Sequence, residues 1–292
     1  MTHKLGFVGL GIMGRPMALN LRKDGHALWV HARRADSMQP LIATGATACA
    51  SPKEVAALAD IVFICVSDTP DVEQVILGEG GLIHGVRKGS VIVDMSTISP
   101  TATRRFADEL KRRGADMLDA PVSGGEIGAV NATLSIMAGG KPEVFARVKP
   151  LFEAMGKNIV HVGDHGAGQV AKACNQIVVA LTIQAVAEAV TFARQNGVDA
   201  GKVRAALLGG FANSKILEVH GQRMLDNAFK PGFKTKLHQK DLKIVLDTAQ
   251  ELGLALPGTA LVAQGLNALM SAGDGELDSS ALIKVVERAS RG

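Results

Sequence analysis

The sequence predicts an α/β fold in two parts, a domain built on a parallel sheet and then an all-helical domain that starts with one long helix. Three observations lead to this prediction. Short runs rich in Val and Ile recur through the first half of the chain, and helix-length segments separate several of them. Eight of the ten prolines precede residue 164. Alternating strands and helices give a largely parallel sheet. The apolar strand runs and most prolines end near residue 164, and this change predicts a second, helical domain.

Six apolar runs predict buried strands, because strands covered on both faces are apolar throughout. The connecting segments carry helix start signals. In one of them Ser51 can cap a helix, Pro52 suits its first position, and Glu54 completes a capping box. The predicted strands cover residues 5–8, 28–30, 61–66, 91–93, 134–137 and 159–162.

Residues 168–195 form an Ala- and Val-rich segment without proline or internal glycine. A helix over this segment would be about 40 Å long and could join two domains. We therefore expect a first domain over 1–164 and a second over 165–292. The Ala-rich helical half offers apolar faces, and we expect a homodimer or homotetramer.

Composition excludes several classes of protein. The 292 residues are 47% hydrophobic and 21% charged, which is typical of a globular protein. Aromatic residues make up only 3%, too few for the stacking surfaces of single-strand nucleic-acid binders. The formal charge of +4 suits a small anionic ligand. We expect no nucleic-acid partner.

The three cysteines, Cys49, Cys65 and Cys174, form neither a disulfide framework nor a zinc-ligand pattern. We expect no metal and a reducing, cytoplasmic location. The apolar start of the chain lacks a signal-peptide cleavage site. No segment approaches about 20 consecutive apolar residues, so we expect no membrane partner.

A glycine motif follows the first predicted strand and opens a predicted helix: Gly9-Leu10-Gly11-Ile12-Met13-Gly14. In this context the pattern indicates dinucleotide binding. The first glycine permits a tight turn, the second lets the backbone approach a pyrophosphate, and the third lets the helix pack near the strand. We therefore expect the first domain to be Rossmann-like. Its cofactor-binding candidates in this motif are Gly9, Gly11, Ile12, Met13 and Gly14.

The end of the second strand bears on cofactor choice. An acid there would bind the ribose 2′-hydroxyl of NAD(H), but the residues are His31-Ala32-Arg33-Arg34. Guanidiniums bind phosphate through charge-assisted bonds, so Arg33 and Arg34 favour NADP(H), with NAD(H) possible. The alternative is a solvated basic turn with Asp36 capping the next helix.

Ser96 and Thr97 follow the strand at 91–93, at the sheet edge where open α/β folds bind ligands. Their hydroxyls are candidates for the nicotinamide ribose. The alternative is local capping, because Ser99-Pro100 begins the next helix.

Lys172 interrupts the apolar long helix, and Lys172, Asn175 and Gln176 have i, i+3 and i+4 spacing, which places them on one helical face. Burial favours the neutral amine, so a lysine in this setting can exchange a proton with an alcohol or aldehyde oxygen. The alternative is a lysine whose ammonium extends to solvent.

Three segments together resemble the β-hydroxyacid dehydrogenases: the opening glycine motif with its Pro-Met-Ala-x-Asn-Leu continuation, the run from Asp119 to Gly125, and the Lys172-x-x-Asn175 helix. The resemblance covers nearly the whole chain. It implies that hydride from the cofactor reduces a carbonyl between the two domains, with Lys172 exchanging the proton and Asn175 orienting the substrate. It also implies that Ser123, Gly124 and Gly125 hold the substrate carboxylate, and backbone amides of small residues can form such an anion site.

Within the family, Gly209-Gly210, residues 229–233, residues 237–242 and Asn175-Gln176 resemble the branch that reduces tartronate semialdehyde (2-hydroxy-3-oxopropanoate) to D-glycerate. Oxidation of 3-hydroxyisobutyrate and reduction of succinic semialdehyde or glyoxylate would use the same residues and differ in the pocket. Asn213 is expected to line that pocket, where this branch has a smaller residue. A non-catalytic dinucleotide-binding module is a remote alternative, because its relatives lack the lysine.

Five lysines lie between residues 230 and 243 and are opposed in that window by Asp241 alone, a local excess of four positive charges: Lys230, Lys234, Lys236, Lys240 and Lys243. A solvated face is one interpretation. A cluster that attracts the cofactor phosphate and the substrate carboxylate is the other. The family resemblance assigns the cofactor contact to Lys240, and we expect Asp241 to orient it.

Overall fold

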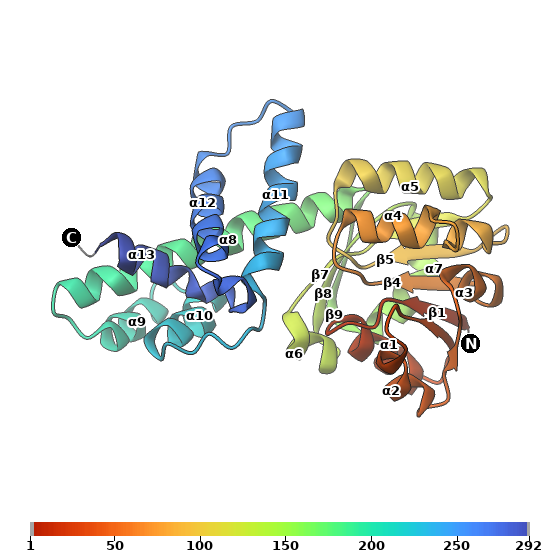
Figure 1. Ribbon diagram of the computed structural model, residues 1–292, viewed down its shortest axis with the longest axis horizontal. Coiled ribbons are helices and arrows are strands. Elements are labelled where there is room, and N and C mark those ends of the chain that lie inside the picture. The colour runs from red at the N-terminus through yellow and green to blue at the C-terminus, as the bar shows by residue number, and fades with distance from the viewer. Residues whose placement is uncertain (1–2, 291–292) are drawn as a thin grey trace. The chain divides into compact units, whose positions relative to one another are not determined.

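The computed structural model describes residues 3–290 (Figure 1). The chain divides into two compact units, Met1–Lys172 and Ala173–Gly292. The first is a sheet covered by helices and the second is a set of packed helices, so the predicted fold class is confirmed.

The first unit contains one sheet, with nine strands within residues 3–290. The strand order is β3-β2-β1-β4-β5-β6-β8-β7, and β9 pairs with β8. Pairing is parallel from β3 to β6, antiparallel at β6–β8 and β7–β8, and parallel again at β8–β9. The strands are β1 (Lys4–Val8), β2 (Ala27–His31), β3 (Thr47–Ala48), β4 (Ile61–Ile64), β5 (Val91–Asp94), β6 (Asp116–Asp119), β7 (Val122–Ser123), β8 (Leu134–Gly139) and β9 (Gly156–Gly163).

Successive residues of the central strands enter two different cores. In β4, Phe63 belongs to a cluster with Met17 and Phe152, while Ile64 belongs to a second cluster with Phe106. Side chains alternate across a strand, so each face of the sheet has its own core under its own helices. The helices of this unit are α1 (Gly14–Lys23), η1 (Ala35–Ser37), α2 (Gln39–Ile42), α3 (Pro52–Leu58), α4 (Thr69–Leu77), η2 (Leu82–His84), α5 (Pro100–Arg112), α6 (Gly125–Val130) and α7 (Pro142–Glu153).

The helix start predicted at Ser51 is present with a small difference. The Ser51 hydroxyl oxygen accepts a hydrogen bond from the Glu54 N–H at 3.2 Å. The Glu54 carboxylate accepts from the N–H of Ala50 at 2.7 Å, one residue before the capping position where a standard box would direct it.

All six predicted strands exist, although the strand predicted at 61–66 ends at Ile64. Strands β3, β6 and β7 were missed. Two of them are only two residues long. The third, β6, begins and ends with a carboxylate and therefore has no continuous apolar run.

The long helix predicted over 168–195 is α8, which spans Ala167–Gln195. From residue 173 onward the described residues are helical apart from loops and one isolated antiparallel bridge between Lys234 and Asp278. The core of the second unit includes Ile183, Leu242 and Leu266. Its further helices are α9 (Ala200–Leu208), α10 (Lys215–Leu225), α11 (Thr235–Glu251), α12 (Pro257–Ser271), η3 (Asp274–Glu276), η4 (Ser279–Leu282) and α13 (Ile283–Ala289).

Helix α8 corrects one sequence expectation. By length and composition it is apolar enough to cross a membrane, whereas no segment was expected to approach that limit. A core helix of a soluble protein passes the same test, and 44% of its most apolar window is buried within the structure. Lys172 also lies in its first turns.

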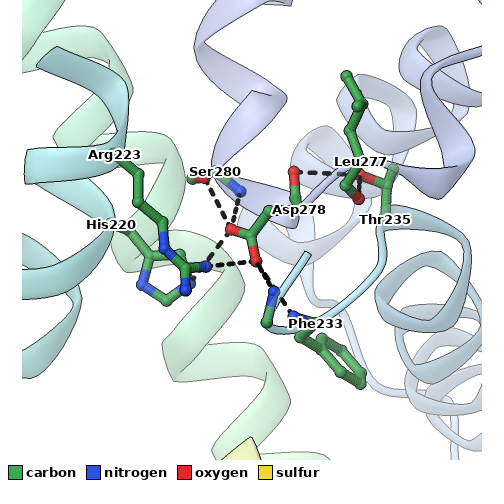
Figure 2. A network of polar contacts seen from close by, with 8 residues as sticks. His220, Arg223, Phe233, Thr235, Leu277, Asp278 and Ser280 are labelled. Carbon is green, nitrogen blue, oxygen red and sulfur yellow. Dashed lines mark hydrogen bonds and ion pairs between the residues drawn. The ribbon is translucent and has the colours of Figure 1, made fainter. Parts of the chain in front are cut away.

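A buried carboxylate organises the segment that leads into α11 (Figure 2). Asp278 is fully buried and lies 2.5 Å from the Arg223 guanidinium. It also accepts hydrogen bonds from the N–H groups of Gly232 at 2.8 Å and Phe233 at 3.1 Å, and from the Ser280 hydroxyl at 2.7 Å. Asp278 thereby joins α10, the loop before α11 and η4.

Candidate active site

The glycine turn between β1 and α1 has the geometry that a dinucleotide pyrophosphate requires. Gly9 has φ of +95°, and a Cβ there would lie 2.3 Å from the Cys65 carbonyl oxygen. A Cβ on Gly14 would lie 2.0 Å from the Gly9 carbonyl oxygen, whereas one on Gly11 would meet nothing within 4 Å. Helix α1 has no acidic residue in its first turn, so its N-terminus can attract an anion. These residues fit a dinucleotide.

The end of β2 lies beside this turn, because the Gly9 N–H donates to the His31 carbonyl oxygen at 3.0 Å. Arg33 and Arg34 follow at the same sheet edge, and both are exposed. The Arg33 guanidinium lies 3.3 Å from the Asp71 carboxylate. Asp36 lies inside η1, which has no side-chain cap, so the capping role considered for Asp36 is wrong.

The loop after β5 is fixed by Ser96. Its hydroxyl oxygen accepts from the Val66 N–H at 3.0 Å, and its own N–H donates to Asp94 at 3.0 Å. The capping of α5 falls to Ser99, whose oxygen accepts from the Ala102 N–H at 3.3 Å. Ser96 therefore joins the ends of β4 and β5, and Thr97 beside it is half-buried.

Asp119, at the end of β6, is fully buried and fastens the start of α8. Its carboxylate accepts from the Gly166 N–H at 2.8 Å and the Gln169 N–H at 2.9 Å. Burial raises the pKa of the Asp119 carboxyl, and these hydrogen bonds act in the opposite direction. Sequence reasoning missed this role. The available signal was Asp119 itself, an acid that follows the apolar pair Met117-Leu118 and lies four residues before Ser123.

Gln169 is also buried and bonds to the loop after β5. Its side-chain oxygen accepts from the Ile98 N–H at 3.1 Å, and its side-chain nitrogen donates to the Ser96 carbonyl at 2.8 Å. Three residues further along the helix, Lys172 is 7% exposed. Most of the Lys172 side chain is therefore out of contact with solvent.

The Ser123-Gly124-Gly125 run leaves the sheet in a turn suited to glycine. Ser123 ends β7 and pairs with Ser135 of β8. Gly124 and Gly125 have φ of +132° and +62°, a backbone conformation that other residues rarely adopt. Gly124 is exposed, and Gly125 begins α6.

In the second unit, polar side chains of α8 and α11 form one hydrogen-bonded chain. The Asn175 amide donates to the Gln176 side-chain oxygen at 2.7 Å, and the Gln176 amide donates to Asp241 at 2.6 Å. The Lys240 ammonium lies 2.8 Å from the other Asp241 oxygen. Asp241 thus orients Lys240, and the structure adds Gln176 as the link between Asn175 and Asp241.

Carboxylates outside the basic window of residues 230–243 pair with three of its five lysines. Lys234 and Lys236 both pair with Glu276, and Lys243 pairs with Asp247 at 2.6 Å. Counted together with Glu276 and Asp247, the excess of four positive charges within the window falls to two.

Asn213 lies in the exposed turn between α9 and α10, and its N–H donates to the Gly210 carbonyl at 3.1 Å. Within residues 3–290 no group of three or more His, Cys, Asp or Glu side chains is arranged to hold a metal ion. Cys49, Cys65 and Cys174 form no disulfide bond.

A Rossmann-like sheet, a glycine turn at its edge and a buried lysine on the following long helix define a nucleotide-dependent oxidoreductase. Family models agree. Residues 4–163 match the NAD binding domain of 6-phosphogluconate dehydrogenase, and residues 166–286 match the NAD-binding domain of NADP-dependent 3-hydroxyisobutyrate dehydrogenase. The chain belongs to the 3-hydroxyisobutyrate dehydrogenase family and is an NAD(P)-dependent β-hydroxyacid dehydrogenase.

The chain is 53% identical to 2-hydroxy-3-oxopropionate reductase of Escherichia coli over 97% of each sequence. It is 40% identical to a probable 3-hydroxyisobutyrate dehydrogenase-like protein of Arabidopsis thaliana, over 98% of this chain and 85% of the relative. Among solved structures, 3-hydroxyisobutyrate dehydrogenase of Mycobacterium tuberculosis with L-serine is 32% identical, with a TM-score of 0.91 over 98% of this chain and 99% of the other.

Proposed function

We propose that this enzyme reduces tartronate semialdehyde to D-glycerate with NADPH, using Lys172 as the proton donor. The observation that carries the proposal is the 53% identity to 2-hydroxy-3-oxopropionate reductase of E. coli over nearly the full length of both chains, since that name denotes the same aldehyde. The burial of Lys172 supports the proton-transfer role.

The residues proposed to hold the cofactor lie along one sheet edge of the first unit, except for Lys240 on α11. The glycine turn binds the pyrophosphate, Arg33 and Arg34 bind the 2′-phosphate, and the loop of Ser96 and Thr97 binds the nicotinamide ribose. The absence of an acid at residues 31–34 supports NADPH over NADH. When bound, the reduced nicotinamide supplies a hydride to the aldehyde carbon.

The chain's own residues hold the substrate and move one proton. Backbone amides of Gly124 and Gly125, with the Ser123 hydroxyl, bind the carboxylate, and Asn175 orients the hydroxy-aldehyde. As the carbonyl becomes an alkoxide, the Lys172 ammonium donates its proton to that oxygen, so hydride plus proton converts the aldehyde to the alcohol. Solvent then returns a proton to the neutral amine. Orientation and charge stabilisation supply much of the rate gain.

Oxidation of 3-hydroxyisobutyrate is the second candidate. The Arabidopsis relative and the M. tuberculosis structure carry that name, and the latter matches this fold at a TM-score of 0.91. Both reactions would use the same lysine, so the choice depends on the pocket around the rest of the substrate.

The test is a panel of initial rates. NADPH and NADH oxidation would be followed with tartronate semialdehyde, methylmalonate semialdehyde, succinic semialdehyde and glyoxylate. We expect the highest kcat/KM with tartronate semialdehyde and NADPH. A preference for methylmalonate semialdehyde would favour the second candidate, and inertness toward all four with both cofactors would overturn both.

A further inference from the structure

We propose that Gln169 is a positioning residue for catalysis, which fixes Lys172 relative to the loop of Ser96 and Thr97. The proposal rests on the proposed role of Lys172 as proton donor. Gln169 is 1% exposed, lies three residues before Lys172 on α8, and is assigned no role by the glycine motif or by the anion-binding turn.

The Gln169 side-chain amide makes two hydrogen bonds to the backbone of one loop, one as acceptor and one as donor. It accepts from the Ile98 N–H at 3.1 Å and donates to the Ser96 carbonyl at 2.8 Å, so it satisfies a donor and an acceptor two residues apart in one loop. A buried amide with both bonds made is costly to replace, because an apolar residue would leave both backbone groups unpaired. Residues i and i+3 lie on the same side of a helix, so movement of Gln169 would move Lys172 with it.

Asp119 anchors the same helical turn from another direction. Its two carboxylate oxygens accept hydrogen bonds from the N–H groups of Gly166 and Gln169. Asp119 lies four residues before Ser123 in the chain. Gly168 lets the helix approach this closely, since a Cβ there would lie 2.3 Å from the Met137 carbonyl oxygen. The start of α8 is therefore tied to the segments that precede Ser123 and that contain Ser96.

This arrangement predicts which kinetic constants depend on Gln169. A displacement of about 1 Å between a proton donor and its acceptor can lower a rate by about 100-fold. The side-chain bonds of Gln169 go to Ser96 and Ile98, not to the glycine turn. Loss of the amide should therefore lower kcat about 10- to 100-fold.

Two variants separate positioning from general structural support. Gln169→Met keeps the length of the side chain and loses both bonds. Gln169→Glu keeps an oxygen that can accept from the Ile98 N–H, but when ionised it places a second oxygen against the Ser96 carbonyl oxygen. Protonation of the Glu carboxylate would restore a donor to the Ser96 carbonyl. We expect kcat of Gln169→Glu to recover toward wild type as the pH is lowered from 8 to 5, whereas Gln169→Met stays low. Gln184→Met is the matched control, because Gln184 lies on α8 with an exposed bond to Glu188.

The readouts are kcat, KM, the primary isotope effect with 4-deuterated NADPH, the melting temperature, and the ¹³C resonance of dimethylated Lys172, assigned by its loss in Lys172→Ala. A larger isotope effect and a shifted resonance in Gln169→Met, but not in Gln184→Met, support positioning. Wild-type kcat and an unshifted resonance in Gln169→Met would overturn it, even with a lower melting temperature. If the wild type is inert toward all four aldehydes, the proposed function fails and the resonance alone decides the positioning role.

Discussion

At the scale of single residues, Arg33 is the proposed determinant of cofactor choice. Its side chain is 82% exposed, and its ion pair with Asp71 spans 3.3 Å. An exposed pair of this kind contributes about 0 to 1 kcal/mol. A 2′-phosphate carries more charge than one carboxylate and accepts several hydrogen bonds from a guanidinium. It would therefore compete well for Arg33.

We expect Arg33→Ala to weaken NADPH binding by about 10- to 100-fold, since a charge-assisted hydrogen bond contributes about 1.5 to 3 kcal/mol. NADH binding should change by less than about threefold. Fluorescence titration with both cofactors would measure the two Kd values. Arg112→Ala removes another exposed, paired arginine and should change neither. Equal losses for both cofactors would contradict the phosphate contact.

At the scale of one element, the start of α11 depends on Asp278. Burial alone would raise the pKa of the Asp278 carboxyl, but hydrogen bonds from Ser280, Phe233 and Gly232 outweigh it and hold the pKa below its usual value. The ionised carboxylate therefore stabilises the fold at pH values above the unfolded-state pKa of about 4. This stabilisation is lost as the pH falls through the lower pKa of the folded state.

Asp278→Asn should destabilise the protein by roughly 2 to 4 kcal/mol at pH 7, because Arg223 would keep a partly buried charge without its partner. The difference from wild type should shrink as the pH falls below about 4. Thermal unfolding between pH 3 and 7 would measure it. Glu276→Gln is the control, since Glu276 pairs with two lysines at the surface, and it should have a much smaller effect. A difference that is constant with pH would refute the role of the carboxylate charge.

The elements were predictable from sequence where burial on both faces left a plain apolar run. Strand β4, with Phe63 and Ile64 in different cores, is an example. Strand β6 was not, because its terminal Asp119 is buried against the backbone N–H groups of Gly166 and Gln169, which come 47 and 50 residues later. A local pattern cannot show that a carboxylate has such partners.

At the scale of the whole molecule, the candidate residues extend along the chain from Gly9 to Lys240. The three glycines and Lys172 were recognisable because each breaks or completes a local pattern. The contacts that hold them were not. Gln169 bonds to Ile98 across 71 residues, and Lys234 pairs with Glu276 across 42. Such pairings follow from the fold alone.

Helix α8 carries both Lys172, the proposed proton donor, and several residues that make these long-range contacts. Asp119 and Gln169 fasten its first turn within the first unit, which ends at Lys172. Gln176 fastens it to α11 within the second unit. An enzyme that depends on one correctly placed ammonium gains from such a rigid support, because orientation supplies much of the rate.

The most direct measurement of the central claim is single-turnover reduction of tartronate semialdehyde by wild type, Lys172→Ala and Lys172→Met, with NADPH affinity measured in parallel. Lys172→Met keeps most of the buried side chain and removes the ammonium. We predict a rate at least about 100-fold lower in both variants, with the Kd of NADPH within about threefold of wild type. A rate within about threefold of wild type in either variant would contradict the assignment of Lys172 as proton donor.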